Sequence, residues 1–348
     1  MTKLLITGGA GFIGSHAAEY FSNIGYEVVV LDNLKRGEIL GKNISLEYNI
    51  EFLKGLNNVS FVNGDIRDFS LLKDLCKEVD VIIHTAAQVA VTTSLKNPRE
   101  DFEINVIGTF NVLEAARLSK GNPTVIYCST NKVYGDNVNK IPVVEKDTRY
   151  EFADEKFRNG IPENFPTDLC GHTPYGCSKL SGDLYVQDYG YTYGLKTGVF
   201  RMSCIYGERQ FGVEDQGWVA WFIAATILDK PITIYGNGKQ VRDVLYVKDL
   251  IELFDKFINS SMRTGVYNAG GGPNNTVSLL ELLSILEKRL GKTPKISFKD
   301  WRVGDQKVYI SNISKAKRDL DWEPRTSLNK GIDTLIEWIN ANKQVFEP

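Results

Sequence analysis

Tyr175 and Lys179 are the pair of residues whose types and spacing best suit acid–base chemistry. Four residues apart on a helix, their side chains lie on the same face. An ammonium group beside a phenol favours the phenolate, so we expect the pKa of Tyr175 to fall from its usual ~10 towards working pH. Tyr175 would then accept the proton of an alcohol as a general base. The alternative is an ordinary pair of exposed helix residues.

A second pair with this spacing, Tyr235 and Lys239, encloses two glycines and an asparagine, which predict a turn rather than a helix. It therefore carries no catalytic prediction.

Ser129 and Thr130 end an apolar run and are placed to supply a hydroxyl partner for Tyr175. The next two residues are Asn131 and Lys132. An acid and a base at these positions would allow water to be eliminated from a substrate, but an amide cannot be the acid and a lysine puts a cation where a carboxylate base is needed. The sequence therefore disfavours dehydration.

Gly8, Gly11 and Gly14 predict a dinucleotide site, because they follow the first strand directly and open the first helix. Gly8 permits a tight turn, Gly11 lets the backbone approach a pyrophosphate, and Gly14 lets helix and strand pack closely. Asp32 ends the second strand, where it can hold a ribose hydroxyl pair and repel a 2′-phosphate. NAD is therefore favoured, although the nearby Arg36 keeps NADP open. The positive nicotinamide ring would further favour the Tyr175 phenolate.

The elements that must position these residues alternate along the first half of the chain. Continuous apolar runs, typical of strands buried on both faces, alternate with helical stretches. This order predicts a Rossmann-type doubly wound parallel α/β sheet. The expected strands are Lys3–Thr7, Glu27–Leu31, Val59–Val62, Val79–His84 and Thr124–Cys128, and the expected helices are Ile13–Ser22, Leu71–Cys76 and Phe102–Leu118.

After about residue 200 a smaller, mixed α/β substrate lobe is expected. Its predicted elements are a helix over Gly217–Leu228, a strand over Pro231–Tyr235, a helix opened by the capping box Ser278 to Glu281, and a helix over Leu328–Ala341. We expect an NAD-binding domain of residues 1–198 with about 241–265, and a nucleotide-sugar-binding lobe of about 199–240 with 266–348.

Two further loops continue the predicted cleft at the carboxyl ends of strands. Gly64, Asp65 and Ile66 are placed to meet the adenine, and the small residues before Gln88 let a nucleotide pass. His84 is more readily explained as a strand-end core residue than as a catalyst.

Composition limits the alternatives. The 348 residues have 43% hydrophobic and 24% charged side chains and a net charge of −2, which gives no electrostatic reason to bind nucleic acid or a membrane surface. Five sparse cysteines predict free thiols, three scattered histidines offer little for a metal, and the apolar start is too short for a signal peptide. We expect a cytoplasmic protein.

These motifs together resemble the extended short-chain dehydrogenase/reductase family of nucleotide-sugar epimerases and dehydratases. The match runs nearly from end to end. It includes Gly8 to Gly14, Asp32, Asn105, Ser129-Thr130 with Val133-Tyr134-Gly135, Tyr175 with Lys179, residues 236–243, Arg302 to Asp305, and Trp322-Glu-Pro.

The resemblance implies roles for particular residues. Thr130 would hydrogen-bond the reacting hydroxyl, Tyr175 would move the proton, and Lys179 would also hold the nicotinamide ribose. NAD would stay tightly bound and would be regenerated in each turnover. The residues expected to bind it are Gly8, Gly11, Phe12, Ile13, Gly14, Asp32, Asn33, Asp65, Ile66, Ala86, Ala87, Gln88, Asn105, Ser129, Tyr175 and Lys179. The nucleotide-diphosphate sugar would contact Gln88, Thr130, Asn131, Cys204, Arg209, Gln216, Gly217, Arg242 and Arg302, with the last two arginines on the diphosphate.

Three stretches, residues 129–136, 172–179 and 207–218, resemble one subgroup of this family, the CDP-paratose 2-epimerases (CDP-tyvelose epimerases). The long segment Asp147 to Leu169 and Cys204, which stands where the 4-epimerases have asparagine, fit the same subgroup. The implied reaction inverts carbon 2 of a CDP-hexose through a keto sugar. A UDP-hexose 4-epimerase is the alternative, because residue spacing does not fix the carbon. A 4,6-dehydratase and a non-catalytic NAD(H)-binding protein are less favoured. Family members commonly pair through the helices Phe102–Leu118 and Tyr175–Tyr189, which implies a homodimer or homotetramer.

Overall fold

Seven strands form the central sheet of the first of two compact units in this computed structural model, which describes residues 1–42 and 45–346. The first unit comprises Met1–Val133, Pro174–Arg201 and Ile251–Tyr267. The strand order is β12-β8-β5-β4-β1-β2-β3, and β1 to β5 pair in parallel. The strands are β1 (Lys3–Thr7), β2 (Glu27–Asp32), β3 (Val59–Asn63), β4 (Val81–His84), β5 (Thr124–Thr130), β8 (Thr197–Met202) and β12 (Thr264–Ala269). The predicted Rossmann-type doubly wound sheet is confirmed.

Helices cover both faces of this sheet, so its central strands are buried on both sides, as their continuous apolar runs predicted. The helices α4 (Phe69–Leu75), α7 (Gly108–Leu118) and α8 (Thr173–Tyr193) pack on one face through a core that includes Leu5, Ile82 and Val199. Phe200, the next residue along β8, instead packs against Phe254 of α10 (Val247–Asn259). The unit also contains α1 (Phe12–Asn23), α2 (Arg36–Leu40), α3 (Glu47–Lys54) and α5 (Val91–Lys96).

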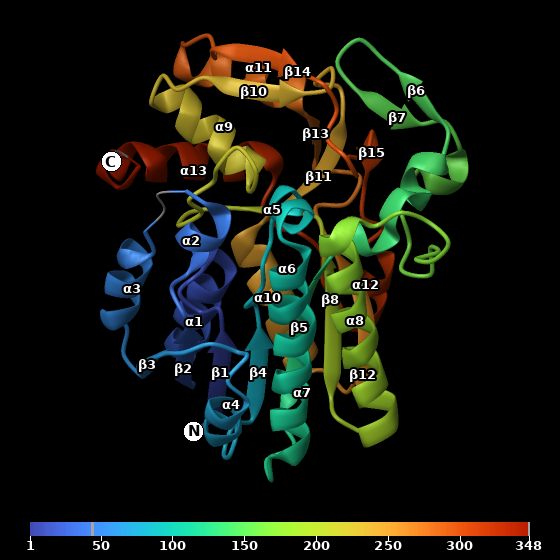
Figure 1. Ribbon diagram of the computed structural model, residues 1–348. Coiled ribbons are helices and arrows are strands. Elements are labelled where there is room, and N and C mark those ends of the chain that lie inside the picture. The colour runs from blue at the N-terminus through green and yellow to red at the C-terminus, as the bar shows by residue number, and fades with distance from the viewer. Residues whose placement is uncertain (43–44, 347–348) are drawn as a thin grey trace. The chain divides into compact units, whose positions relative to one another are not determined.

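The helix expected over Phe102–Leu118 is interrupted. A short helix, α6 (Pro98–Phe102), leads into a π-helical turn, η1 (Glu103–Ile107), before α7 begins at Gly108. The wider turn carries Asn105, and such turns often occur at functional sites. Figure 1 shows α7 and α8 running side by side, and the Tyr189 hydroxyl of α8 donates to Glu114 of α7 at 2.6 Å.

The second unit comprises Tyr134–Thr173, Met202–Leu250 and Asn268–Pro348. Its main core packs α9 (Trp218–Ile227), α11 (Leu279–Leu290) and α13 (Leu328–Ala341) around β11 (Val241–Tyr246). The predicted capping box is present at Ser278 and Glu281. The remaining elements are β6 (Val143–Glu145), β7 (Tyr150–Phe152), β9 (Cys204–Tyr206), β10 (Ile232–Tyr235), β13 (Thr276–Ser278), β14 (Ile296–Lys299), β15 (Val308–Tyr309), α12 (Ser314–Leu320), and the 3₁₀ turns η3 (Glu155–Phe157) and η4 (Lys343–Val345); η2 (Asn131–Lys140) begins in the first unit.

The boundaries of the units differ in two places from the expected domains. Residues 134–173 pack with the second unit, whereas the sequence placed them with the first. Val241 to Leu250 also belong to the second unit. The last two residues of the expected lobe, 347 and 348, lie outside the described residues.

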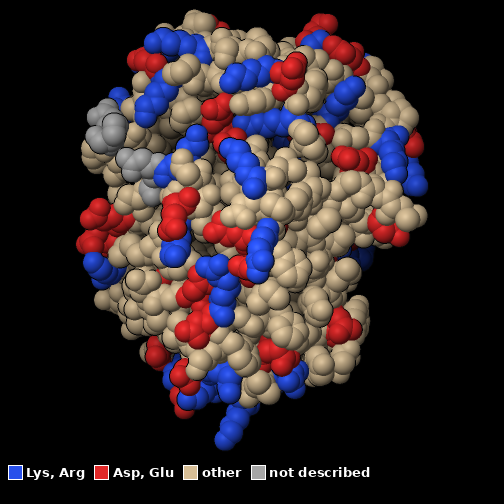
Figure 2. Space-filling view, viewed as in Figure 1, with Lys and Arg blue, Asp and Glu red and all other residues tan. Residues whose placement is uncertain are grey.

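In the described part of the chain, no helix is both long and apolar enough to cross a membrane. Lys and Arg side chains are interspersed with Asp and Glu on the face drawn in Figure 2.

Candidate active site

The glycine turn between β1 and α1 has the geometry that a pyrophosphate site requires. Gly8 has a φ of +70°, and a Cβ there would lie 2.6 Å from the backbone nitrogen of Ala86. A Cβ on Gly14 would lie 2.5 Å from the Gly8 oxygen, so both positions need glycine. Gly11 caps α1, and among the described residues no side chain caps the helix and no acid stands in its first turn. The first N–H groups of α1 therefore suit an anion.

Phe12 and Ile13 begin α1 and keep part of their surface accessible. Ala86 and Ala87, in the loop after β4, are also partly exposed. Because Ala86 backs directly onto Gly8, small residues in this loop are needed for the close approach that the sequence predicted.

Asp32 ends β2 with its carboxylate held by backbone groups. Oδ2 accepts from the Ala10 N–H at 3.1 Å and Oδ1 accepts from the Leu34 N–H at 2.8 Å. Burial raises the pKa of Asp32, and these N–H groups oppose that rise. Each carboxylate oxygen can accept more than one hydrogen bond, so a role towards a ribose hydroxyl pair remains compatible with this arrangement.

Asp65 has an ion-pair partner that the sequence did not indicate. Its carboxylate forms a bidentate pair with Arg67, at 2.9 and 2.7 Å, and accepts from the Asn33 amide at 2.8 Å. Hydrogen bonding from Arg67 lowers the pKa of Asp65 to about 2. Ile66 is core rather than site: its side chain packs against Gly108, so only its backbone is available to a ligand.

Thr130 and Tyr175 come together in the first unit. Thr130 is the last residue of β5, and Tyr175 lies in the first turn of α8, where its N–H donates to Ser94 Oγ at 3.1 Å. Burial raises the pKa of Tyr175 to about 12, and a hydrogen bond with the Thr130 side chain lowers it. The expectation that this pKa falls towards neutrality is therefore wrong for the protein alone, because the loss of solvent outweighs the favourable contacts.

Lys179 is buried one turn after Tyr175, with 3% of its surface exposed. Its Nζ lies over the Tyr127 ring, 4.2 Å from the centroid, and burial lowers its pKa to about 8. Electrostatic interactions with Cys128, Asp183 and Asp101 oppose that lowering. A buried ammonium against an aromatic face is a cation–π arrangement. Lys179 is therefore not a member of an ordinary pair of exposed helix residues, which was the alternative interpretation of its sequence.

Ser129 does not face an open cleft. It is fully buried, and its hydroxyl donates to Asp183 Oδ2 at 2.6 Å. Asp183 in turn forms a buried ion pair with Arg201 of β8, at 2.9 Å. Ser129 thus joins the strand end that carries Thr130 to the helix that carries Lys179, and it positions the site rather than offering a hydroxyl to a ligand.

Gln88 and Asn105 also have their polar atoms engaged. The Gln88 side chain, 1% exposed, bonds to the backbone of Ala90 and to Asp101. The Asn105 oxygen accepts from the Gln88 N–H at 2.9 Å, and its amide lies at 3.0 Å from Ser178 Oγ. Both side chains are therefore held in place by contacts within the protein. Asn131 is also buried, with its Oδ1 at 3.3 Å from Thr130 Oγ1.

His84 is held between two hydroxyls, with Nδ1 at 2.7 Å from Thr7 Oγ1 and Nε2 at 3.0 Å from Thr109 Oγ1. Burial lowers its pKa to about 3, so the ring is neutral. Both features favour a structural role. The described residues contain no cluster of three His, Cys, Asp or Glu side chains that could hold a metal.

In the second unit, both arginines expected on the diphosphate are paired with carboxylates. Arg242, which is buried, bonds Asp305 at 2.5 Å, and Arg302 pairs with Asp215 at 3.0 Å. The Arg302 guanidinium also stacks on the Tyr235 ring, 3.8 Å from its centroid. These contacts preorganise the guanidinium groups.

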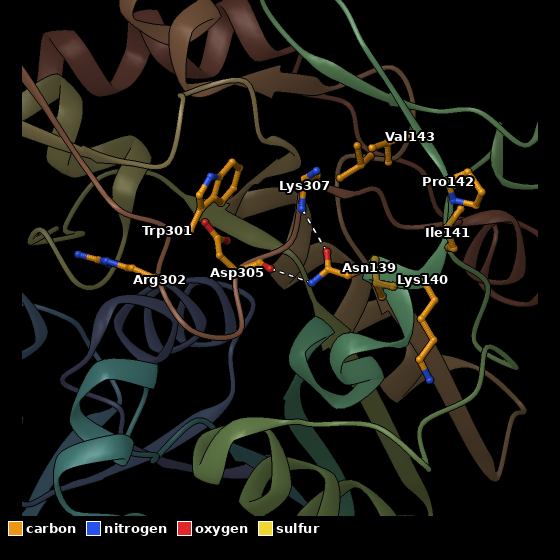
Figure 3. Close-up of a pocket in the computed structure, with 11 residues that line it drawn as sticks. Asn139, Lys140, Ile141, Pro142, Val143, Trp301, Arg302, Asp305 and Lys307 are labelled. Atoms are coloured by element: carbon orange, nitrogen blue, oxygen red, sulfur yellow. Dashed lines mark hydrogen bonds between the residues drawn. The ribbon is translucent and has the colours of Figure 1, made fainter.

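A cavity of about 460 Å³ in the second unit includes Arg302 and Asp305 in its lining. Figure 3 shows Asn139 between Lys307 and Asp305. The Asn139 side chain accepts from the Lys307 N–H at 3.3 Å and donates to the Asp305 carbonyl oxygen at 2.9 Å. The Arg302 side chain extends away from these three residues.

The other expected substrate residues lie in or beside the loop before α9. The Cys204 sulfur accepts from the Trp218 indole N–H at 3.2 Å. Arg209 is buried with a φ of +57°, a conformation that non-glycine residues adopt at a cost in free energy. Gln216 pairs through its backbone with Val213, and Gly217 precedes α9 as its N-cap with a φ of +77°. Nothing in the sequence joined Trp218 to Cys204.

A doubly wound sheet with a glycine turn in its first unit, combined with a threonine–tyrosine–lysine cluster, defines a protein of the short-chain dehydrogenase/reductase class. The comparisons agree with this class and narrow it. The family model described as GDP-mannose 4,6 dehydratase matches residues 5–335. The chain therefore belongs to this family of nucleotide-sugar epimerases and dehydratases within the extended short-chain dehydrogenases/reductases.

Individual relatives match over almost the whole chain. A CDP-paratose 2-epimerase of Salmonella typhi is 42% identical over 97% of this chain and 99% of its own length. A putative UDP-glucose 4-epimerase of Methanocaldococcus jannaschii is 33% identical, covering 98% and 99%. The structure of a UDP-glucuronic acid 4-epimerase of Bacillus cereus, in complex with UDP-glucuronic acid and NAD, is 28% identical with a TM-score of 0.81, covering 98% and 100%. The resemblance to the 2-epimerase subgroup is thus confirmed.

Proposed function

We propose that this protein is an NAD-dependent nucleotide-sugar epimerase that inverts carbon 2 of a CDP-hexose, in the manner of CDP-paratose to CDP-tyvelose. The observation that carries the proposal is the cluster of Thr130, Tyr175 and Lys179. In the sequence Thr130 is followed by Asn131 and Lys132, where a dehydratase would need an acid and a base. The closeness of the Salmonella typhi 2-epimerase supports the choice of carbon 2 and of CDP.

The residues of the first unit fit NAD. The glycine turn leaves the first N–H groups of α1 to a pyrophosphate, and Asp32 stands at the end of β2, where a carboxylate would repel a 2′-phosphate. Lys179 would hold the nicotinamide ribose. When bound, NAD supplies an acceptor for a hydride from a ring carbon and later the donor that returns it. Its positive ring would favour the Tyr175 phenolate, which burial alone disfavours.

Tyr175 and Thr130 carry out the proton transfer. The Thr130 hydroxyl orients the reacting sugar hydroxyl, and Tyr175 takes its proton as the C–H hydride leaves the same carbon, which gives a keto sugar. Tyr175 then returns the proton as the hydride is delivered to the opposite face, which inverts the carbon. Lys179, whose pKa burial lowers to about 8, would supply a positive charge one turn of α8 after the phenol.

Dehydration is a poor alternative, even though the description of the matching family model names a dehydratase. Expelling a hydroxyl as water needs a general acid and a general base besides Tyr175. Neither Asn131 nor Lys132, which follow Thr130, can supply them. A UDP-hexose 4-epimerase is the stronger alternative, and the Methanocaldococcus jannaschii relative supports it, because the same residues would serve inversion at carbon 4.

The second unit would hold the nucleotide. The preorganised guanidinium groups of Arg242 and Arg302 suit a diphosphate. At Cys204, where 4-epimerases have asparagine, a thiol engaged by Trp218 would give a less polar contact to the sugar.

The test begins with the cofactor released by denaturing the purified protein and identified by its absorbance and mass. The native protein is then incubated with CDP-, UDP- and GDP-hexoses, and the stereochemistry at each carbon is followed by NMR. Inversion at carbon 2 of a CDP-hexose is the expected result. Inversion only at carbon 4 would support the alternative and reject the present proposal, and loss of water would reject both epimerases.

We also propose that the protein pairs with a second copy through α7 and α8. Apolar side chains on or next to these helices are exposed, among them Phe110, Leu184 and Tyr185 at 38%, 54% and 45%. In Figure 2 the surface over α8 is mostly uncharged. Contiguous exposed apolar surface of this kind marks interaction sites.

A further inference from the structure

Asp101 is a buried acid next to the proposed active site that neither the sequence motifs nor the reaction accounts for. It lies in α6, one residue before that helix ends, and 1% of its surface is exposed. Aspartate is rarely buried to this extent unless it is paired. Its surroundings therefore call for an explanation.

One oxygen of Asp101 belongs to a polar network that reaches α8. Oδ1 accepts from Gln88 Nε2 at 2.6 Å and from Asn105 Nδ2 at 3.2 Å. The Asn105 amide also reaches Ser178 Oγ at 3.0 Å, and that hydroxyl donates to the Tyr175 carbonyl oxygen at 3.0 Å. Asp101 is thus joined, through two side chains, to the turn of α8 that presents Tyr175.

The other oxygen, Oδ2, is buried and has no hydrogen-bond partner among the described residues. A buried polar atom without a partner costs free energy and is uncommon in folded proteins. A packing role alone would be met at lower cost by an apolar side chain of similar size.

The charge of Asp101 acts on both members of the catalytic pair. It raises the pKa of Tyr175 and opposes the lowering of the Lys179 pKa by burial. The other groups that face this pair are Cys128 on β5 and Asp183 on α8, with the neutral His84 on β4 facing Lys179. Burial raises the pKa of Asp101 itself, and side-chain hydrogen bonds with Ser178 and Gln88, together with the charge of Lys179, lower it. The acid and the catalytic pair are therefore electrostatically linked.

We propose that Asp101 is a positioning residue of the active site, which fixes the first turns of α8 through Asn105 and Ser178 and whose charge acts on Tyr175 and Lys179. This inference rests on the proposed function for its consequence in turnover. An anion near the phenol makes Tyr175 a weaker acceptor for the proton of the sugar hydroxyl. Once Tyr175 has accepted that proton, the same anion helps to keep it on the phenol while the keto sugar is bound. No net proton is gained or lost over the cycle.

The test replaces Asp101 by Asn, which removes the charge while keeping the shape, and follows the ionisation of Tyr175 by NMR of tyrosine labelled with ¹³C. The Tyr175 signal is assigned by its loss in Tyr175→Phe. Removing the anion should shift the Tyr175 titration to lower pH by about one unit. The acid limb of the pH profile of kcat/KM should move in the same direction. Glu100→Gln, which removes a charge from the neighbouring position of the same helix, should leave both unchanged.

Asp101→Leu is the second variant, because it removes the charge without burying an unpaired amide. Superposition of either titration on that of the unaltered protein would overturn the proposal, as would failure of both variants to fold while Glu100→Gln folds. Because the NMR titration needs no substrate, a shift in it without epimerase activity towards any sugar nucleotide would uphold the role of Asp101 and reject the proposed function.

Discussion

At the scale of single residues, replacing Tyr175 by Phe removes the one oxygen that can take and return the substrate's proton. We expect kcat to fall by about 10²- to 10⁴-fold, the usual contribution of a general acid–base group. The glycine turn and Asp32 are untouched, so the cofactor content should stay unchanged. Turnover by NMR and cofactor release on denaturation measure the two quantities.

Tyr191→Phe is the matched control for this variant, since Tyr191 lies on the same helix and is 76% exposed. It should keep full activity. Comparable activity in Tyr175→Phe and Tyr191→Phe would refute the assignment of the base.

The sequence predicted the residue types of the site better than their partners. Gly8, Gly14 and Tyr175 follow from local patterns, because a turn and a helix register are properties of short segments. Asp65, 32 residues beyond Asn33, and Asp183, 54 residues beyond Ser129, become partners of those residues only when strands and helices meet. The same holds for the pKa of Tyr175, whose direction is set by burial that no spacing reveals.

At the scale of elements, the contact between the glycine turn and α1 can be tested with Gly14→Ala. The added Cβ would lie 2.5 Å from both the Gly8 oxygen and the Gly9 Cα, so the turn must shift. We expect a loss of about 1–3 kcal/mol of stability from overpacking, together with a loss of bound cofactor. Thermal unfolding followed by circular dichroism and the cofactor content of the purified protein measure these effects.

Gly55→Ala controls for the substitution itself. Gly55 has αR geometry, and its nearest neighbour for a Cβ, the Phe52 oxygen, is at 3.4 Å. This variant should be neutral or slightly more stable, as glycine replacements at compatible positions are. Normal cofactor content in Gly14→Ala would show that the close approach of helix and strand is dispensable.

The junction between β5, β8 and α8 depends on the buried ion pair of Asp183 and Arg201, which are 0% and 5% exposed. Asp183→Asn would leave the guanidinium buried without its counter-charge and weaken the Ser129 contact. We expect the free energy of unfolding in urea to fall by about 3–5 kcal/mol. Glu78→Gln, at an exposed pair with Lys3, should cause no measurable change. Equal stability of the two variants would contradict a structural role for the buried pair.

The π turn at Glu103–Ile107 was beyond sequence prediction for a related reason. The stretch Phe102–Leu118 has the periodicity of one continuous helix, and the inserted turn is stabilised by contacts that Asn105 makes with Gln88 and Ser178, far away in the chain. Helix propensity records neither contact.

At the scale of the whole molecule, the doubly wound parallel sheet was predictable because alternating strands and helices allow few connections. The division into units was not, because residues 134–173 lack strong periodicity. Ile161 pairs with Ser311, and Tyr134 donates to Asn268 at 2.7 Å, so distant residues assign this segment to the second unit.

The proposed pairing through α7 and α8 predicts that the protein is a dimer, or a tetramer built from such dimers, and that Leu184→Lys separates the copies. Leu184 is 54% exposed on α8, and a lysine there would place two charges in an apolar interface. A stable interface of this kind buries on the order of 1,600 Å². Size-exclusion chromatography with light scattering should therefore give the mass of a multimer for the unaltered protein and of a monomer for the variant.

Leu169→Lys, at a position that is 92% exposed in the second unit, should keep the multimer. A monomer in the unaltered protein at micromolar concentration would rule out this interface.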